Sequence, residues 1–214
     1  MVYLNGKNNL FYKCDHTHTE IGSPEAKLYS VDIPLRDGAL DVTDQISDTV
    51  FYQDREILIE LELRSVRGEW PMHVSHLMND IHGKEIRVEF DDDPRYYWTG
   101  RAAVSMAEDH GATAGITITV TAKPFKRCNV RSTIYDQAIG TTDTLTFTTT
   151  APRTYFRFDT HSLTSDATVT YDGETLTIPA GETTLYGLFV LPGTHTFDLA
   201  GTVTLTIETE EAML

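Results

Sequence analysis

The sequence predicts a mainly β protein, in which a β-sandwich-like N-terminal domain with one α-helix (α+β) is followed by a small C-terminal β-sandwich. Three observations predict this class: apolar and polar side chains alternate through most of the chain, one segment has a helical period, and the composition changes after residue 127. The alternation is the main signal, because successive side chains of a strand point to opposite faces of a sheet.

Alternation in the first half is clearest at residues 57–63, where aliphatic side chains take every second position and mostly charged side chains take the others. This pattern is typical of a strand that is buried on one face. Residues 86–90 repeat it, residues 91–94 (Asp-Asp-Asp-Pro) predict a turn, and residues 96–104 supply the returning strand. A further strand is predicted at 116–120, whose threonines suit the wet face of a sheet.

One segment has the helical period instead. Its apolar residues, at spacings i, i+4, i+7, i+8 and i+11, are Trp70, Val74, Leu77, Met78 and Ile81. The spacing predicts a helix over residues 71–82 that packs on the sheet. Pro71 suits the first helical position, and Gly83 suits the left-handed residue that follows the last turn. We interpret His82 as a favourable charge near the helix C-terminus.

The last third of the chain is predicted to be all β. Its turn pairs, such as Asp172-Gly173 and Pro192-Gly193, recur at the short spacing typical of a sandwich. The predicted strands are 145–149, 154–158, 167–171, 175–178, 184–190, 194–199 and 202–207.

A change in charge composition marks a boundary between the two domains. Residues 1–127 carry 21 acidic and 14 basic side chains, whereas the remainder carries 11 acidic and 3 basic ones, is rich in threonine and has no lysine. The stretch 128–143 has little periodicity. We therefore expect domains at 1–133 and 134–214.

The overall composition excludes several classes of protein. The chain has 214 residues, which suffice for one or two domains, and its net charge of -15 opposes binding to phosphate backbones. We expect no membrane insertion, because no run of about 18 apolar residues occurs, and the first residues lack a signal-peptide core. Cys14 and Cys128, far apart and without metal-site spacing, are predicted to be buried free thiols.

No catalytic motif is present, so we assign no catalytic residue, no cofactor and no metal ligand. The strongest cluster for a metal-dependent hydrolase is Asp15, His16 and His18, because alternate side chains of an extended segment would point both imidazoles the same way. The other interpretation is ordinary loop histidines, since a second pair of ligands is not identifiable.

Two further clusters could bind a ligand, but each also has a purely structural interpretation. Residues 91–93 offer three carboxylates for Ca²⁺ or Mg²⁺, but they do not match the EF-hand spacing, and a solvated turn between two strands, which we prefer, accounts for them without any ion. Residues 96–98 (Tyr-Tyr-Trp) offer a sugar-stacking platform, but neighbours on a strand point to opposite faces, which favours packing. A carbohydrate-binding adhesion module is thus the alternative function.

Several short motifs occur in an order and spacing similar to those of a known family. They are Asn5-Gly6-Lys7, Ile33-Pro-Leu-Arg-Asp-Gly38, Leu40-Asp-Val-Thr43, the strand 55–63, His82-Gly83-Lys84, and Asp92-Asp-Pro-Arg-Tyr-Tyr-Trp-Thr-Gly100. Over roughly residues 1–127 the sequence resembles the distal tail proteins (Dit) of long-tailed bacteriophages (siphoviruses) and prophages. Leu35 departs from the pattern, because members often carry glycine there.

The resemblance implies a virion structural protein of the phage tail tip, or baseplate, that is assembled in the host cytoplasm and is not an enzyme. Its partners would be itself, in a homo-hexameric ring, together with the tail tube protein and the tail-tip and tail-associated proteins of the host-adsorption apparatus. DNA would pass through the lumen without specific binding, and an acidic lumen would favour this passage. The second domain of such proteins is often galectin-like or similar to a carbohydrate-binding module, which makes a host-surface glycan a candidate partner. Here that domain is short and lacks tryptophan, so sugar binding is not carried over from the resemblance.

The segment from Arg36 to Arg55 is a long polar excursion before regular alternation resumes. Loops of this length usually have a function, so we predict that it reaches a neighbouring subunit, the alternative being a surface loop without a partner. The candidate interface residues are Arg36, Asp37, Leu40, Val42, Val50, Phe51 and Tyr52.

Overall fold

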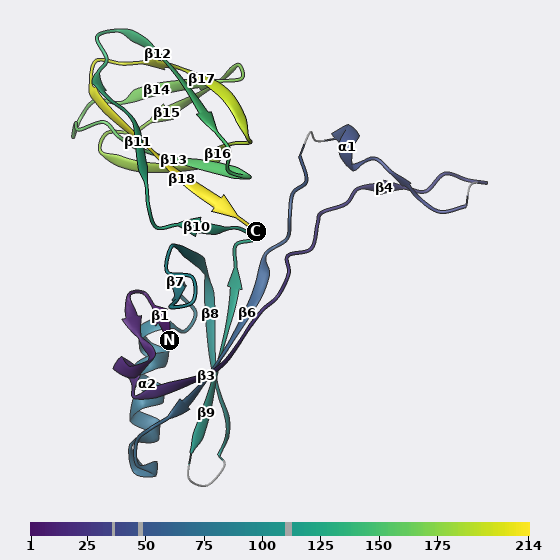
Figure 1. Cartoon of the computed structure of the whole chain (residues 1–214), viewed down its shortest axis with the longest axis vertical. Helices are drawn as coiled ribbons and strands as arrows, with labels where there is room; N and C mark the ends of the chain where they lie inside the picture. Colours follow the sequence, from purple (N-terminus) through teal and green to yellow (C-terminus); the bar gives the residue numbers. More distant parts are fainter. Residues whose placement is uncertain (36, 47–48, 110–112) are drawn as a thin grey trace. The chain divides into compact units, whose positions relative to one another are not determined.

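The computed structural model describes residues 1–35, 37–46, 49–109 and 113–214. Two compact units make up the chain: residues 1–126 with Leu214, and residues 127–213. The division lies within the short strand β10 (Lys126–Cys128), seven residues before the boundary that we expected. Both units are mainly β, and the one long helix lies in the first, as predicted (Figure 1).

The N-terminal unit contains an antiparallel sheet that includes every strand predicted for it. Its neighbours pair in the order β2-β1-β7-β8-β9-β6-β3. The bounds are β1 (Val2–Leu4), β2 (Lys7–Asn8), β3 (Cys14–Ile21), β6 (Arg55–Leu63), β7 (Glu85–Phe90), β8 (Tyr96–Asp109) and β9 (Ala114–Ala122).

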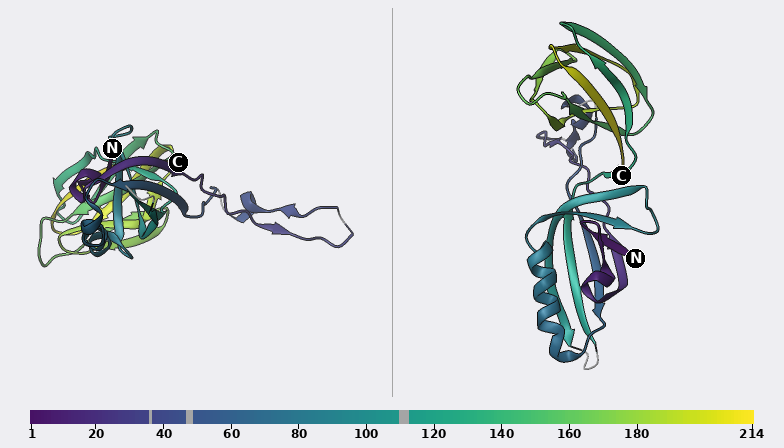
Figure 2. Two further views of the ribbon diagram at one scale, coloured as in Figure 1. Left: turned by 90° about the horizontal axis from the view of Figure 1, so that it is seen from below. Right: turned by 90° about the vertical axis from the view of Figure 1, so that its left-hand side faces the viewer.

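Helix α2 (Trp70–Ile81), preceded by the 3-10 turn η2 (Arg67–Glu69), packs on one face of this sheet (Figure 2). The alternation of β6 explains why: the aliphatic residues on one face of this strand are at most 3% exposed, and they share a core with the apolar stripe of the helix. The core residues of these two elements are Ile57, Ile59, Leu61, Leu63, Trp70, Val74, Leu77 and Ile81. The predicted packing of helix on sheet is confirmed.

The helix ends largely as its sequence predicts. Pro71 lies in the first turn, and Gly83 has a φ of +72°, the left-handed conformation that glycine adopts without a steric penalty. The role of His82 differs from our expectation. Its Nδ1 accepts a hydrogen bond from the backbone N–H of Val104 at 2.9 Å, a role that requires this nitrogen to be unprotonated. His82 therefore ties the helix end to β8 rather than providing a charge for the helix dipole.

A short 3-10 helix, η1 (Asn9–Tyr12), connects two distant strands of the sheet. The buried Asn9 accepts from the backbone N–H of Val2 at 3.4 Å and donates to the carbonyl of Cys14 at 2.8 Å, so it links β1 to β3. Cys14 and Cys128 are both buried and free, as predicted. Burial raises the pKa of the Cys14 thiol to about 12, which leaves it unreactive at neutral pH.

The C-terminal unit is a sandwich of two antiparallel sheets that share one core. The first sheet has the order β11-β18-β13-β16 and the second β12-β17-β14-β15. The bounds are β11 (Ser132–Ala138), β12 (Thr142–Thr149), β13 (Arg153–Asp159), β14 (Ala167–Tyr171), β15 (Glu174–Ile178), β16 (Glu182–Val190), β17 (Gly193–Ala200) and β18 (Thr204–Met213). All seven strands predicted here are present.

Strand β11 was not predicted, since it lies in the stretch that we expected to be irregular. Only Tyr135 of its seven residues is buried, so the strand carries no alternation that a sequence pattern would reveal. It is fixed instead by its pairing with β18, which is a contact distant in sequence. In the described part of the chain, no helix has the length and apolar character needed to cross a bilayer.

Candidate functional site

The most unusual feature of the N-terminal unit is the segment of residues 22–54 between β3 and β6, which we call the arm. Its two limbs run side by side (Figures 1 and 2) and extend the β3–β6 pair. Gly22 donates to the carbonyl of Glu56 at 2.8 Å, Gln53 to that of Glu25 at 2.8 Å, and Lys27 to that of Phe51 at 2.7 Å. Among the described residues, the two limbs of the arm are therefore paired by backbone hydrogen bonds, as in a hairpin, and a further bond ties its first residue to β6.

The far part of the arm has its own small sheet and a helical turn. Strand β4 (Ser30–Val31) pairs with β5 (Leu40–Asp41), and α1 (Thr43–Ile46) follows. The carboxylate of Asp41 accepts from the hydroxyl of Thr43 at 2.6 Å and from its backbone N–H at 2.9 Å, which lowers the pKa of Asp41. These local bonds hold the arm in shape without help from the main sheet.

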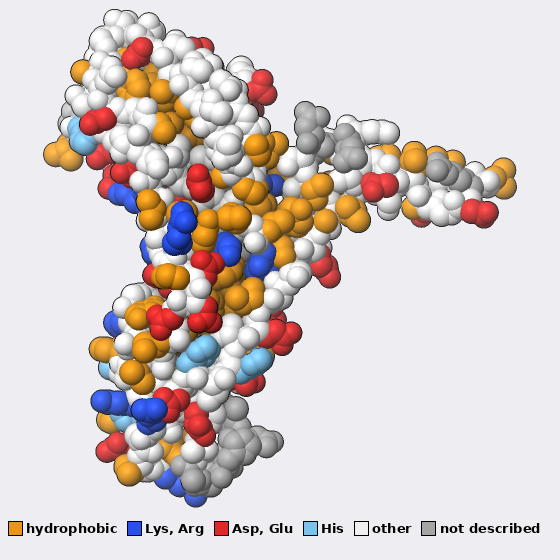
Figure 3. Space-filling view, in the orientation of Figure 1, with side chains coloured by type: hydrophobic (Ala, Val, Ile, Leu, Met, Phe, Trp, Pro, Cys, Tyr) orange, Lys and Arg blue, Asp and Glu red, His pale blue; other side chains and the backbone are white. Residues whose placement is uncertain are grey.

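The arm exposes an unusual amount of apolar side chain. Seven of the eighteen large hydrophobic residues that are exposed in the described chain lie on it, although it makes up only 33 of 214 residues. They are Leu28, Tyr29, Val31, Ile33, Leu35, Ile46 and Phe51, with exposed fractions from 39% to 109%. Hydrophobic side chains are visible along the arm in Figure 3. Exposed apolar side chains in this number are typical of interaction sites.

The predicted interface residues all fall on the arm, with different degrees of exposure. Asp37 and Phe51 are exposed, whereas Leu40, Val42 and Val50 are half-buried within the hairpin. Tyr52 is also half-buried; its ring meets that of Phe125 edge-on at a centroid distance of 5.7 Å, at the root of the arm. Arg36 lies outside the described residues. Their part in a subunit interface stays a prediction.

The prediction missed the first limb of the arm, where most of the exposed apolar residues lie. Tyr29, Val31, Ile33 and Leu35 alternate with polar residues and proline, a pattern that also fits a half-buried strand. Leu35 is noteworthy because its φ is +68°, a conformation that costs a leucine about 1–2 kcal/mol. This is the position at which members of the resembling family often carry glycine.

The sheet face opposite helix α2 is acidic along β6 and β3. Glu56 and Glu60 are exposed on β6, Glu62 is half-buried there, and Glu20 on β3 lies opposite Leu58 on the same face. The adjacent strand β9 presents threonines on this face, at 117, 119 and 121. The result is a polar, negatively charged sheet surface that helix α2 does not cover.

The histidine cluster does not form half of a metal site. A β-bulge at Thr17 shifts the register, so that His16 lies opposite Leu61 of the core face and His18 opposite Glu60 of the acidic face. The prediction that both imidazoles point the same way is therefore wrong, because it assumed an unbroken strand. Asp15 is engaged by Arg64, and burial is the main cause that lowers the pKa of His16. No group of three potential metal ligands occurs within residues 1–35, 37–46, 49–109 and 113–214.

The carboxylates and aromatic residues around the β7–β8 turn have structural partners. Asp91 lies 3.4 Å from the N-terminal amine, and Asp93 pairs with Lys126 at 2.7 Å. Lys126 also lies over the rings of Tyr96 and Trp98, at 4.8 and 5.6 Å from their centroids. These contacts agree with the interpretation as a turn and packed strands.

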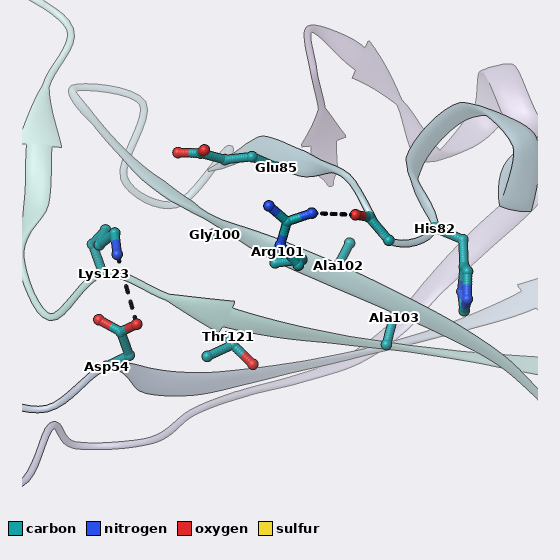
Figure 4. A pocket seen from close by; sticks show the side chains of 10 residues that line it. Asp54, His82, Glu85, Gly100, Arg101, Ala102, Ala103, Thr121 and Lys123 are labelled. Carbon is teal, nitrogen blue, oxygen red and sulfur yellow. Dashed lines mark hydrogen bonds and ion pairs between the residues drawn. The ribbon is translucent and has the colours of Figure 1, made fainter.

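A groove of about 500 Å³ lies on the N-terminal unit near the root of the arm (Figure 4). Three of its charged side chains are engaged: Arg101 donates to the carbonyl of Gly83, and Lys123 lies 3.7 Å from Asp54. Gly100, Ala102 and Ala103 line its floor.

The aromatic residues of the C-terminal unit serve mainly as core. Phe147, Phe156 and Phe197 meet edge-on with centroid distances of 4.9 to 5.4 Å, and Phe156 and Phe158 are fully buried. Tyr171 is held by a hydrogen bond of 2.9 Å to His195. This packing accounts for these aromatic residues without a carbohydrate ligand.

Comparison with known proteins finds likeness in structure only. No protein-family model and no curated protein matches the sequence. A chain of the baseplate of phage p2, in its activated conformation with Sr, is 8% identical, with 93% of this chain and 90% of that chain covered and a TM-score of 0.44. The Dit protein (gp 19.1) of phage SPP1, described as a paradigm of the hub adsorption apparatus in phages infecting Gram-positive bacteria, is 15% identical with a TM-score of 0.60. That match covers 100% of this chain and 98% of the SPP1 chain, so the two proteins share their fold over the whole length.

Proposed function

We propose that this chain is a structural component of a phage or prophage tail tip: a ring-forming hub that joins the tail tube to the host-adsorption apparatus. The observation that carries the proposal is the shared fold with the SPP1 hub protein over nearly the full length of both chains. The order of short motifs in residues 1–127 supports it independently of the structure.

The arm is the part that we assign to ring formation. A closed ring of identical subunits uses head-to-tail contacts, in which one surface of each copy meets a different surface of the next. An ordered hairpin that exposes seven large apolar side chains suits this role, because burying them against a neighbour removes apolar surface from water. Six copies are the number that the resemblance implies.

The acidic face of β6 and β3 is the surface that we assign to the channel. A polyanion passing close to Glu56 and Glu60 would be repelled at short range, while salt screens the repulsion beyond about 8–10 Å. DNA would thus pass without being held. The role is structural, with the tail tube and tail-tip proteins as partners, and the virion tail tip is the place where the protein acts.

The proposal is tested by size-exclusion chromatography with light scattering, followed by electron microscopy. We expect closed rings for the natural chain, alone or with its tail partners, and monomers when residues 25–51 are replaced by a short Gly/Ser turn. The control is Met72→Ser, which removes an exposed apolar side chain outside the arm and should leave rings intact. Rings formed without the arm would contradict its role, and a chain that stays monomeric with its tail partners would contradict the proposed function.

A further inference from the structure

A cavity of about 360 Å³ lies in the C-terminal unit, at the seam between its two sheets. It is lined by residues of β15 and of β16, and each of these strands is the last of its sheet in the described chain. Its apolar walls are the side chains of Tyr171, Leu176, Leu185 and Leu188. A volume of this size is near the lower end of the range for ligand pockets and accommodates one large apolar side chain.

An irregularity in β16 makes room for the cavity. Tyr155 of β13 pairs with Phe189, and Arg157 pairs with Thr184, so the one residue between them on β13 faces residues 185–188 of β16. Extra residues of this kind bend a strand and interrupt its ladder. Gly187, within the bulge, lines the cavity, and a Cβ there would meet no atom within 4 Å. The bulge thus opens the edge of the first sheet.

The inward face of β15 also opens, toward the first residue of the strand. Ile178 is buried, Leu176 is half-buried and Glu174 is exposed, although alternation places all three on the same face. Glu174 lies opposite Tyr171, whose hydroxyl is held by a hydrogen bond of 2.9 Å to His195. The result is an apolar pocket with a fixed aromatic wall and a carboxylate at its mouth.

The free edge of β15 lies beside this pocket. In the described part of the chain β15 pairs with β14 alone, in regular register, and it contains neither proline nor lysine, which commonly protect an edge. An edge of this kind accepts a further strand, whose backbone hydrogen bonds provide affinity while pockets for alternate side chains provide specificity. Edge and pocket together fit an extended polypeptide.

Charge indicates which polypeptide fits. Asp172 and Glu174 are exposed at this edge, and residues 128–214 have 11 acidic and only 3 basic side chains. Those three arginines are engaged away from the edge, by Glu182, Glu208 or the ring of Phe189. A second copy would bring the same acidic edge, and like charges that face each other destabilise strand pairing. A basic segment of a different protein is complementary.

We propose that β15 binds an extended basic segment of a partner protein as an added strand, with one large apolar side chain of that segment in the cavity. Because residues two apart on a strand point to the same face, a lysine or arginine two positions from the apolar residue would meet Glu174. The site lies in the C-terminal unit, so it adds a binding activity to the ring-forming role proposed above and does not depend on it.

The first test is a selection of random heptapeptides displayed on filamentous phage, with the immobilised full chain as bait. Recovered peptides should share a large apolar residue and a lysine or arginine two positions away. Gly187→Leu, which fills the cavity, should not recover this pattern, whereas Gly140→Leu, at another exposed glycine with free space around its Cβ, should recover it. Failure of the natural chain to recover the pattern would overturn the inference.

Fluorescence anisotropy with the best peptide then tests the mode of binding. Gly187→Leu should weaken binding about ten-fold or more, because the apolar side chain loses its burial. Methylation of the peptide's backbone nitrogens should abolish binding at alternate residues only, since every second N–H of an added strand faces its neighbour. Equal tolerance of methylation at all positions would contradict strand addition.

Exchange of charge tests the recognition of a basic segment. Glu174→Gln should weaken binding about two- to five-fold, because the carboxylate is exposed to solvent. Glu174→Lys should prefer the peptide in which glutamate replaces the basic residue. This reversal of preference cannot result from loss of folding, so it remains decisive if Gly187→Leu folds poorly. Absence of the reversal would overturn the inference.

Two other outcomes would assign the site to a different occupant and would also overturn the inference. One is binding of the dye 8-anilinonaphthalene-1-sulfonate, lost in Gly187→Leu, with no peptide recovered, which would indicate a small hydrophobic molecule. The other is self-association that Gly187→Leu abolishes and Gly140→Leu does not, which would indicate a second copy of this chain.

Discussion

Strand β6 directly follows the arm in the chain, yet large apolar side chains are buried in β6 and exposed on the arm. Ile59 of β6 is 0% exposed, whereas Ile33 is 40% exposed and Leu35 is 109% exposed. Both segments are ordered and hydrogen-bonded, so the difference is not one of secondary structure. It shows that the sheet and helix bury their apolar residues within the chain, whereas the arm leaves its own exposed.

The largest effect should come from truncating equivalent side chains in the two regions. Ile59→Ala is expected to lower the free energy of unfolding by about 2–5 kcal/mol, because it leaves a cavity in a closed core. Ile33→Ala should change it by less than about 0.5 kcal/mol in the monomer. Urea unfolding followed by tryptophan fluorescence measures this directly, since Trp70 and Trp98 are the only tryptophans in the sequence and both lie in the N-terminal unit. Equal losses for both variants would show that the arm is part of the cooperative core.

A smaller effect is expected from two glycines with nearly the same backbone conformation. Gly83 at the end of α2 has a φ of +72° and Gly38 in the arm has +73°, and a Cβ at either position meets no atom within 4 Å. Gly83→Ala should cost about 1–2 kcal/mol of unfolding free energy, through backbone strain alone. Gly38→Ala should cost less than half of that, because the arm can adjust without unfolding the sheet. The same urea experiment tests the pair, and an equal cost would contradict the comparison.

The smallest effect is a pH dependence within the body of the N-terminal unit. Hydrogen bonds from Lys7 (2.5 Å) and then from Tyr12 (2.6 Å) lower the pKa of Asp80 below 3.8. As the pH falls, Asp80 is therefore protonated at a higher pH in the unfolded chain than in the folded one. Ionised Asp80 stabilises the fold above about pH 4, and this stabilisation is lost as the pH falls through the lowered pKa.

Asp80→Asn measures that contribution. Because the pair with Lys7 is partly exposed to solvent, the loss at pH 7 should be about 1 kcal/mol or less. The difference between the natural chain and the variant should shrink on acidification below pH 4. Asp92→Asn, at an exposed turn position, is the matched control and should show no such dependence.

The sequence predicted the positions of the helix and of most strands better than it predicted how the strands pair. Alternation located β6 to β9 and the strands of the second unit other than β11, and the helix stripe located α2, because these patterns are local consequences of burial on one face. The bulge at Thr17 and the strand β11 left no such pattern, since they depend on pairing with β6 and β18. The first limb of the arm was missed for the opposite reason. Tyr29, Val31 and Ile33 alternate like the residues of a half-buried strand, but no other described part of the chain packs over them, and they are exposed.

The two units of this protein differ in their content of lysine, and therefore in their reactivity toward amine reagents. All six lysines lie at or before residue 126, where the first unit ends, and the second unit has none. An amine-reactive dye or cross-linker would therefore label only the N-terminal unit. Within the arm, Lys27 is the single such target, so a cross-link from it to another copy would report directly which surface the hairpin touches in an assembled particle.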